Sequence, residues 1–332
     1  MTTPSGIWLV ARQEFRMRLR TGRWKWLLGG WLVLLAVFTG LLDLSVSTGY
    51  GYVDDDQSRR GVPIFGILMF FVLGMVMVIS PALTSQAING DRERGTLATL
   101  QVTRLRPGEI ALGKLLAGWG VGLVMLALSL PFAGLAMAKG GITVARLAAV
   151  YGVVALLIGV VCAVSQALSA LLARSITSAL LSYLTVAFLC VGTLISFALI
   201  APLVADERTV QTPEGYAYTD TRSREDRVWW LLAPNPFVIL ADSAPRVPPR
   251  LVDYGDAYYY DDYDPLSSIG REVRELRRPP SDGDYDPNQA DVPPVWPWGL
   301  GFNVLLGIGS VVLTTRRLRT PSRTLARGVR IA

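Results

Sequence analysis

The chain has 332 residues, of which 51% are hydrophobic and 17% charged, with a formal net charge of +6. Soluble domains carry about 25% charged residues, so this composition excludes a soluble enzyme, a fibrous protein and a wholly disordered chain, and it favours a polytopic membrane protein. The chain has no histidine, which excludes histidine-based acid–base catalysis and most metal centres, and its two cysteines lie within apolar runs and are predicted to be free.

Residues 1–23 are predicted to form a cytoplasmic amphipathic helix. An apolar stripe and a basic stripe lie side by side at the helical period. The apolar stripe is Trp8, Ala11, Phe15 and Leu19, and the basic one is Arg12, Arg16 and Arg20. Such a helix can lie in the membrane interface with its arginines near anionic lipid. The alternative is an ordinary basic flank of the first span.

Six apolar runs are long enough to cross a bilayer, which takes roughly 20 mostly apolar residues. They lie at 24–42, 62–83, 115–137, 147–172, 177–204 and 295–313. The basic segments fall on one side if both termini are cytoplasmic, with Lys139 and Arg146 as the exceptions. We therefore predict an all-α protein with six transmembrane helices in the cell membrane. The tail at 314–332 is predicted to be basic and cytoplasmic.

The segment between the second and third spans carries the densest mixture of charge. Asp91 to Arg94 alternate in sign, and Leu97 and Leu100 follow. This mixture favours a protein-docking surface over a free linker. Pro107-Gly108 breaks the segment, and Glu109 stands in the first turn of the helix that runs back, where negative charge is favoured.

This segment resembles the signature of ABC exporter permeases of the type-2 class. The matching residues, in order, are Asp91, Arg92, Glu93, Gly95, Thr96, Leu97, Leu100, Pro107, Glu109, Ile110, Gly113 and Lys114. The chain departs from that signature at Asp91, more often Glu, at Ala98, which replaces a frequent Glu, and at Gly108. A second similarity is the Asn-Pro segment from Ala233 to Phe237, which these permeases carry before their last span.

The resemblance implies a working unit of two permeases, identical or different, and two ATPase subunits. The loop between spans two and three would be a coupling helix that docks on the ATPase. The residues expected to carry the coupling are Asp91, Arg92, Glu93, Arg94, Gly95, Thr96, Leu97, Leu100, Glu109 and Lys114. ATP and Mg²⁺ would bind to the partner ATPase, and this chain would hold no cofactor, no metal and no catalytic residue.

Two features of the sequence allow other interpretations. Residues 108–114 have the Gly-x-x-x-x-Gly-Lys spacing of a phosphate loop, but Leu115 stands where Ser or Thr would bind Mg²⁺. Neutral polar residues within the spans, Gln166, Ser169 and Asn303, are candidates for lining a substrate path, and hydrogen bonding between helices is the alternative.

Residues 205–294 are predicted to be an extracytoplasmic loop with 18 acids against 10 arginines. Residues 228–240 are apolar but too short to span, which favours a re-entrant or interfacial hairpin. The Tyr/Asp-rich stretch 253–264 is expected to be a solvated tether, and 271–278 to be a charged helix. Asp282, Asp284 and Asp286 imitate a calcium loop, but Pro287 replaces its required glycine.

The function that the sequence favours is the permease subunit of an ATP-driven exporter, with the lipid bilayer as its surroundings and no nucleic-acid partner. Two alternatives stay open. One is a non-transporting membrane subunit of an ABC-like complex in envelope assembly or signalling. The other is a membrane-embedded enzyme, for which the spans offer no constellation of catalytic residues.

Overall fold

The computed structural model describes residues 3–19, 23–49, 59–96, 105–211, 217–222, 224–246, 250–253, 258–261, 264–278 and 292–319. The chain divides into two compact units, Met1–Val186 with Asn303–Ala332 and Ala187–Phe302. Six helical segments are long and apolar enough to cross a membrane, which confirms the predicted helical membrane fold. They are Trp24–Thr48, Gly61–Glu93, Pro107–Ala138, Val144–Leu171, Ser175–Val204 and Trp296–Arg319.

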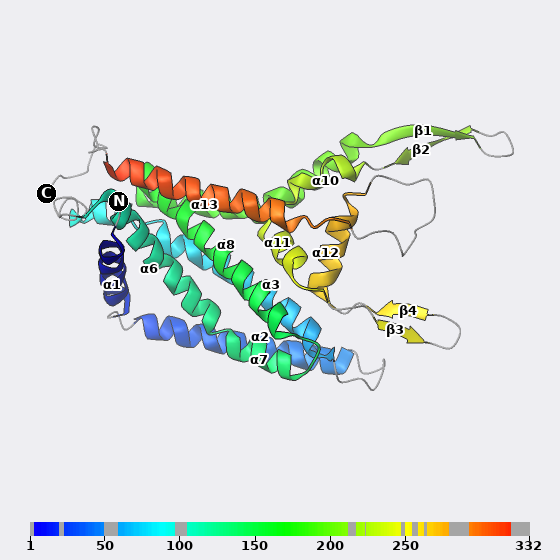
Figure 1. The fold of residues 1–332 in the computed structure, drawn as a ribbon, viewed down its shortest axis with the longest axis horizontal. Helices are drawn as coiled ribbons and strands as arrows, with labels where there is room; N and C mark the ends of the chain where they lie inside the picture. Colours follow the sequence, from blue (N-terminus) through cyan, green and yellow to red (C-terminus); the bar gives the residue numbers. More distant parts are fainter. Residues whose placement is uncertain are drawn as a thin grey trace. The chain divides into compact units, whose positions relative to one another are not determined.

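The first unit consists of helices alone in its described residues (Figure 1). They are α1 Pro4–Leu19, α2 Arg23–Gly49, α3 Gly61–Thr84, α4 Asn89–Glu93, α6 Pro107–Ala127, α7 Leu130–Ala138, α8 Val144–Leu171, most of α9 Ser175–Ala187 and the last part of α13 Trp296–Arg319. The helix that contains the third span begins at Pro107, with Glu109 in its first turn as predicted, because proline suits the first helical position. This span is interrupted after Ala127, and α7 restarts at Leu130 with Pro131 in its first turn.

Glycines let α3, α6 and α8 approach closely in the centre of this unit. A β-carbon on Gly118 of α6 would lie 2.3 Å from the Thr84 side chain of α3. A β-carbon on Gly122 would lie 2.5 Å from Ile158 of α8. The sequence pattern of small residues in the third span therefore marks helix packing, as is common in membranes.

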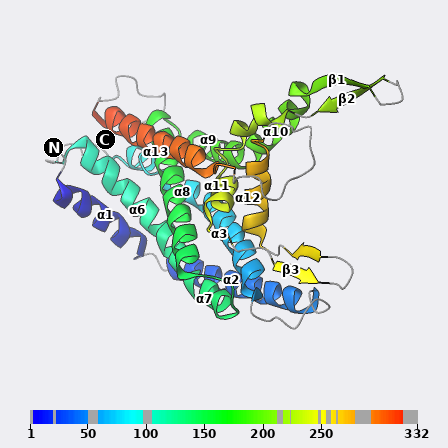
Figure 2. The ribbon, with the colours of Figure 1, turned by 45° about the vertical axis from the view of Figure 1, so that its right-hand side comes forward.

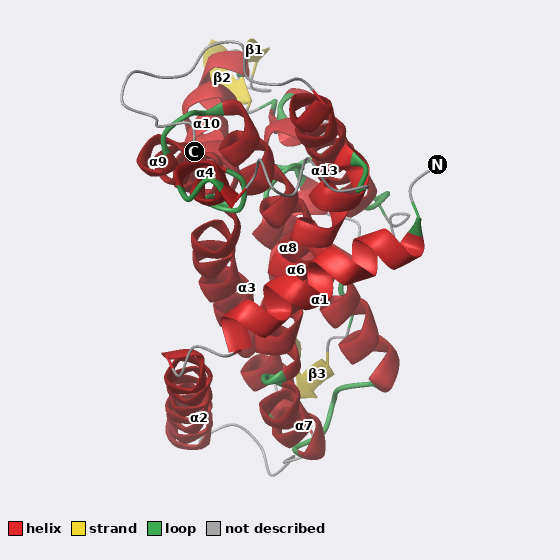
Figure 3. Ribbon diagram, turned by 90° about the vertical axis from the view of Figure 1, so that its left-hand side faces the viewer, coloured by secondary structure: helices red, strands yellow, loops and turns green. Residues whose placement is uncertain are grey.

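Helix α2 lies at the edge of this unit (Figure 3). Trp31 Nε1 of α2 donates to the Met125 carbonyl at 3.0 Å, and the ring of Phe38 stacks on Phe71 at 3.9 Å. Val33 and Leu41 are among the apolar side chains that it leaves more than half exposed. An apolar face of this kind suits contact with lipid.

The two basic residues that depart from the charge bias have structural explanations. Lys139 Nζ lies 2.5 Å from Asp43 Oδ1, so an acid neutralises its charge. Arg146, at the start of α8, is 1% exposed and is not a basic flank in solvent. The orientation of the termini stays a prediction.

The second unit contains the end of the fifth span and the region before the sixth. After α9 come a π-helix, η2 Phe188–Gly192, then α10 Thr193–Ile200 and η3 Ala201–Val204. Beyond them lie β1 Asp206–Gln211, β2 Ala217–Arg222, η4 Glu225–Arg227, η5 Trp229–Leu231, α11 Pro236–Ser243, β3 Arg250–Asp253, β4 Tyr258–Asp261, α12 Pro265–Glu275 and the start of α13. The strands pair in antiparallel hairpins, Asp206 with Arg222 and Arg250 with Asp261.

Much of the predicted outer loop is a folded core. Leu232, Ala233, Val238, Val273 and Val295 are buried together, with Trp229 against them. Of the charged helix expected at 271–278, residues 271–275 form the end of α12, and 276–278 follow it as a turn. A hairpin, β3–β4, occupies part of the stretch expected to be a tether, and the apolar segment 228–240 forms η5 and the start of α11. Its re-entrant placement stays a prediction, and the calcium-like aspartates lie outside the described residues.

Candidate functional site

The segment after α3 is held in place by serines from two other helices. Ser169 Oγ of α8 accepts hydrogen bonds from Ile88 N and Asn89 N at 3.1 Å each. Ser178 Oγ of α9 donates to the Ser85 carbonyl at 2.8 Å. The first N–H groups of a helix lack partners within it, and a five-residue helix is unstable alone. Tertiary contacts therefore determine where α4 lies.

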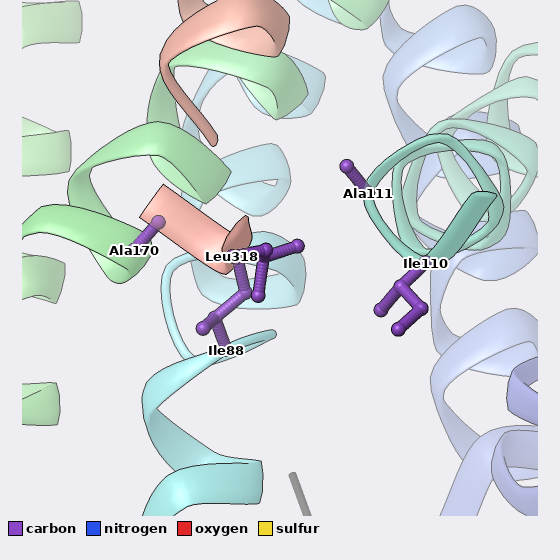
Figure 4. Packing of buried hydrophobic residues seen from close by; sticks show 5 residues of the cluster. All are labelled: Ile88, Ile110, Ala111, Ala170 and Leu318. Carbon is purple, nitrogen blue, oxygen red and sulfur yellow. The ribbon is translucent and has the colours of Figure 1, made fainter. Parts of the chain in front are cut away.

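An apolar cluster lies beneath this segment. It brings together side chains from the turn before α4, from α6, from α8 and from the last turn of α13 (Figure 4). Its members are Ile88, Ile110, Ala111, Ala170 and Leu318, with Leu105 packed against them. Residues that are far apart in the chain thus share one core at this end of the first unit.

Lys114 is the centre of a buried ion network. Its Nζ lies 2.5 Å from Asp91 Oδ2 of α4 and 2.5 Å from Glu14 Oε1 of α1, and the side chain is only 2% exposed. Arg94 Nη2 reaches the other oxygen of Asp91 at 3.1 Å. Lys114 is thus buried between two largely buried carboxylates, as a buried charge requires, and Arg94, whose side chain is 69% exposed, adds the second cation from the surface. We name Glu14, Asp91, Arg94 and Lys114 the ion network.

Arg92 and Glu93 bind the turn between α8 and α9. Arg92 Nη1 donates to the Asn89 side chain at 3.2 Å and to the Leu172 carbonyl at 3.4 Å. The Glu93 carboxylate accepts from Ser175 N at 3.3 Å, at the start of α9, where negative charge is favoured. The α4 segment is thereby attached to two membrane-length helices.

Only a few side chains of this segment face solvent. Glu93, Arg94 and Thr96 are exposed, whereas Asp91 and Lys114 are internal. Gly95 takes a φ of 71°, the left-handed conformation with which helices commonly end. Leu97 and Leu100 lie outside the described residues. We define residues 85–96 as the coupling segment.

Glu109 faces the start of the chain. Its Oε1 accepts from both Thr3 N and Thr3 Oγ1 at 2.7 Å, and its Oε2 accepts from Arg106 N at 3.0 Å. The carboxylate therefore caps its own helix and ties α1 to it. Glu109 is 3% exposed, so its role in this structure is anchoring.

Helix α1 packs tightly on α6 (Figure 2). A β-carbon on Gly113 would lie 2.6 Å from Val10 Cβ, and one on Gly120 would lie 2.3 Å from Phe15. Ala11 is 1% exposed, but Trp8 is 64% exposed. The predicted apolar stripe is therefore not one lipid-facing surface: Ala11 and Phe15 belong to the face that packs within the protein.

The candidate path residues lie among the helices. Gln166 Nε2 donates to the Ala111 carbonyl of α6 at 2.8 Å, and Ser169 holds the start of α4. Asn303 is 1% exposed. Gln166 and Ser169 thus make the interhelical bonds that were the alternative to a substrate path.

The phosphate-loop spacing at 108–114 belongs to a helix. All seven residues lie in α6, and Lys114 Nζ is occupied by two carboxylates. A phosphate loop needs a loop conformation and a free lysine. In the described residues, no group of three His, Cys, Asp or Glu side chains could hold a metal ion.

A second polar centre lies in the other unit, in the Asn-Pro segment. Asn235 is 1% exposed. Its Nδ2 donates to the Cys190 carbonyl in the π-helix at 2.8 Å and to Thr193 Oγ1 at 2.9 Å. Its Oδ1 accepts from Phe237 N at 2.9 Å and caps α11. π-Helical turns often occur at functional sites.

We expect Asn235→Ala to lower the free energy of unfolding by about 2–3 kcal/mol, because a buried carbonyl and a helix cap both lose their partner. Asn235→Asp keeps the cap but turns an oxygen toward the Cys190 carbonyl, so it should lower the free energy of unfolding by at least as much as Asn235→Ala. Thermal unfolding in detergent, followed by circular dichroism, measures both. An aspartate variant as stable as the parent would refute this role of the amide.

Six membrane-length helices and a charged segment folded against them define a multi-pass membrane protein. Residues 8–249 match the family model described as ABC-2 family transporter protein. The chain therefore belongs to the ABC-2 transporter family and is a membrane permease component, whose family partners with ABC ATPase subunits. A comparison with curated proteins finds no match.

Proposed function

We propose that this chain is the transmembrane permease subunit of an ATP-driven exporter in the cell membrane. It would form the substrate pathway as a dimer with a second permease, identical or different. A separate ATPase subunit, which binds ATP and Mg²⁺, would dock on the coupling segment. The observation that carries the proposal is that this segment exposes Glu93, Arg94 and Thr96, while Asp91, Arg92 and the backbone at 88–89 are bound to the helices of the bundle.

The contacts of the coupling segment suggest how a docked ATPase would move the membrane helices. Asp91 is bound to α6 through Lys114, and Arg92 and Glu93 are bound to the α8–α9 turn. Ser169 and Ser178 add bonds to α8 and α9. A displacement of α4 would therefore act on the third, fourth and fifth spans together, because close-packed elements move as units.

The test reverses the exposed charges. Glu93→Lys with Arg94→Glu should lower the recovery of the ATPase that co-purifies with the full-length chain by tenfold or more. Like charges facing each other across an interface cost several kcal/mol of binding free energy, and about 1.4 kcal/mol corresponds to a tenfold change in affinity. Glu93 also accepts from Ser175 N, and Arg94 pairs with Asp91, so the thermal midpoint and elution of the permease alone are measured beside recovery. Loss of ATPase recovery supports docking when the permease itself still folds and elutes like the parent.

The matched control is Glu275→Lys with Arg278→Glu on and after α12, which makes the same charge exchange in the other unit. It should leave ATPase recovery unchanged. Undiminished recovery with Glu93→Lys/Arg94→Glu would overturn the docking assignment. ATP-dependent export by vesicles that contain both subunits then tests transport itself.

A further inference from the structure

Helix α1 has two faces of opposite character. Val10, Ala11 and Glu14 are turned toward the protein, and Gly113 and Gly120 of α6 bring the two helices into close contact. On the other face Trp8 and Leu9 are 64% and 59% exposed. Arg12 and Arg16 are also exposed there. The outward face thus combines apolar side chains with two cations.

The acid–base balance of this helix is divided between its faces. Glu14 is the one acid in residues 3–19, and it points inward to Lys114 at 2.5 Å. The outward face therefore presents positive charge with no acid beside it on the same helix. In the first turn of α2, at the start of the first span, Lys25 is exposed and Trp26 is 84% exposed. Tryptophan and lysine at a span's end are typical of the headgroup level of a membrane.

We propose that the outward face of α1, formed by Trp8, Leu9, Arg12 and Arg16, is a docking surface for anionic phospholipids, and that its occupancy is transmitted to the coupling segment through Glu14, Lys114 and Asp91. Apolar side chains enter the acyl boundary while the arginines meet the lipid phosphates. Charge complementarity selects anionic over zwitterionic lipid.

The transmission follows from a shared lysine. Lys114 holds Glu14 of α1 and Asp91 of α4 at the same distance of 2.5 Å. Any shift of α1 toward or away from the headgroups changes how Lys114 divides between the two carboxylates. Lipid that fixes α1 against α6 should then keep Lys114 in place and steady α4. Lipid bound to α1 would thus regulate the coupling segment. That this changes ATPase docking rests on the function proposed above, whereas amide exchange in α4 can be measured without an ATPase.

The experiment uses the full-length chain in nanodiscs of phosphatidylcholine with or without phosphatidylglycerol. Retention of phosphatidylglycerol is measured by native mass spectrometry, and amide exchange is followed in peptides that cover residues 4–19 and 85–96. We expect phosphatidylglycerol to slow exchange in both peptides. Arg12→Gln/Arg16→Gln should reduce its retention at this site by about 10- to 30-fold, from the usual contribution of an arginine near an anionic surface.

Two further variants separate the parts of the proposal. Arg59→Gln/Arg60→Gln removes the same charge at the start of α3, at the opposite end of that helix from the coupling segment, and should leave retention and exchange unchanged. Glu14→Gln should keep the lipid on α1 but abolish the effect of phosphatidylglycerol on peptide 85–96.

Unchanged retention in Arg12→Gln/Arg16→Gln would overturn the docking surface. Inorganic phosphate that protects the same peptides in phosphatidylcholine alone would show a free-anion site and would also overturn it. If phosphatidylglycerol does not change amide exchange in peptide 85–96 of the parent chain, the transmission is overturned. Normal ATPase recovery in the same experiment would leave the proposed function standing.

Discussion

Replacing Lys114 with methionine should lower the free energy of unfolding by about 3–5 kcal/mol, the usual loss when one partner of a buried ion pair is removed. Asp91 and Glu14 would then keep negative charge close together, with side chains only 11% and 16% exposed. The coupling segment and α1 would both lose their link to α6. Unfolding in a mild detergent, followed through thermal midpoints and amide exchange, measures the loss.

Lys139→Met is the matched control for Lys114→Met. Lys139 also pairs with an acid at 2.5 Å, but its side chain is 42% exposed, as is Asp43 at 43%. Exposed pairs contribute about 0–1 kcal/mol, so this variant should be almost neutral. Adding Asp91→Asn and Glu14→Gln to Lys114→Met should restore part of the stability, because no charge is then left buried without a partner. Equal costs for the two lysines would show that burial does not govern the network.

The six spans could be predicted from sequence because a bilayer imposes length and apolarity on each helix separately. The coupling segment could be located through the charge cluster at 91–94 and its resemblance to a permease signature. The direction in which each charged side chain points could not be predicted, because it depends on the contact of α1, α4 and α6. Lys114 matched the signature by its position alone. No neighbouring residue in the sequence indicated that its side chain would be buried and paired with two carboxylates.

Glu14 was missed, although the sequence held a signal. It follows Ile7, Val10 and Ala11 at the spacing i, i+3, i+4, i+7, which places it on the packing face of an amphipathic helix. An acidic side chain on a buried face needs a cation as its partner, because an unpaired buried charge is unstable. The predicted stripe from Trp8 to Leu19 instead combined residues of both faces, since Trp8 is exposed and Ala11 is buried.

The folded part of the predicted outer loop could not be predicted from sequence, for a related reason. Its acidic, aromatic and proline-rich composition is typical of a mobile segment. The bonds that organise it join residues distant in the chain: Arg274 binds Asp242, and Asp242 binds the start of α13, 53 residues further on. Composition carries no information about such pairs.

Asp242→Ala should be the most damaging single change in the second unit, with a loss of about 3–5 kcal/mol or more. The Asp242 side chain is fully buried and its Oδ1 pairs with Arg274 Nε. Its Oδ2 accepts from Val295 N at 2.6 Å and Trp296 N at 2.7 Å, where α13 begins. The change would leave Arg274, whose side chain is only 16% exposed, without its carboxylate, and two N–H groups at the start of α13 without their acceptor.

The same aspartate joins α11, α12 and the first turn of the sixth span, so its loss should loosen all three together. Amide exchange of the full-length chain should rise in peptides covering 236–243, 265–275 and 295–302, while the coupling segment keeps its protection. Asp206→Ala is the control: Asp206 also binds arginine, Arg224 at 2.6 Å, but is 47% exposed, and its removal should cost about 1 kcal/mol or less. Arg274→Met should reproduce much of the damage, because it leaves the fully buried carboxylate with only backbone partners. Faster exchange confined to α11 in Asp242→Ala would contradict this joint role and would reduce the residue to a local helix contact.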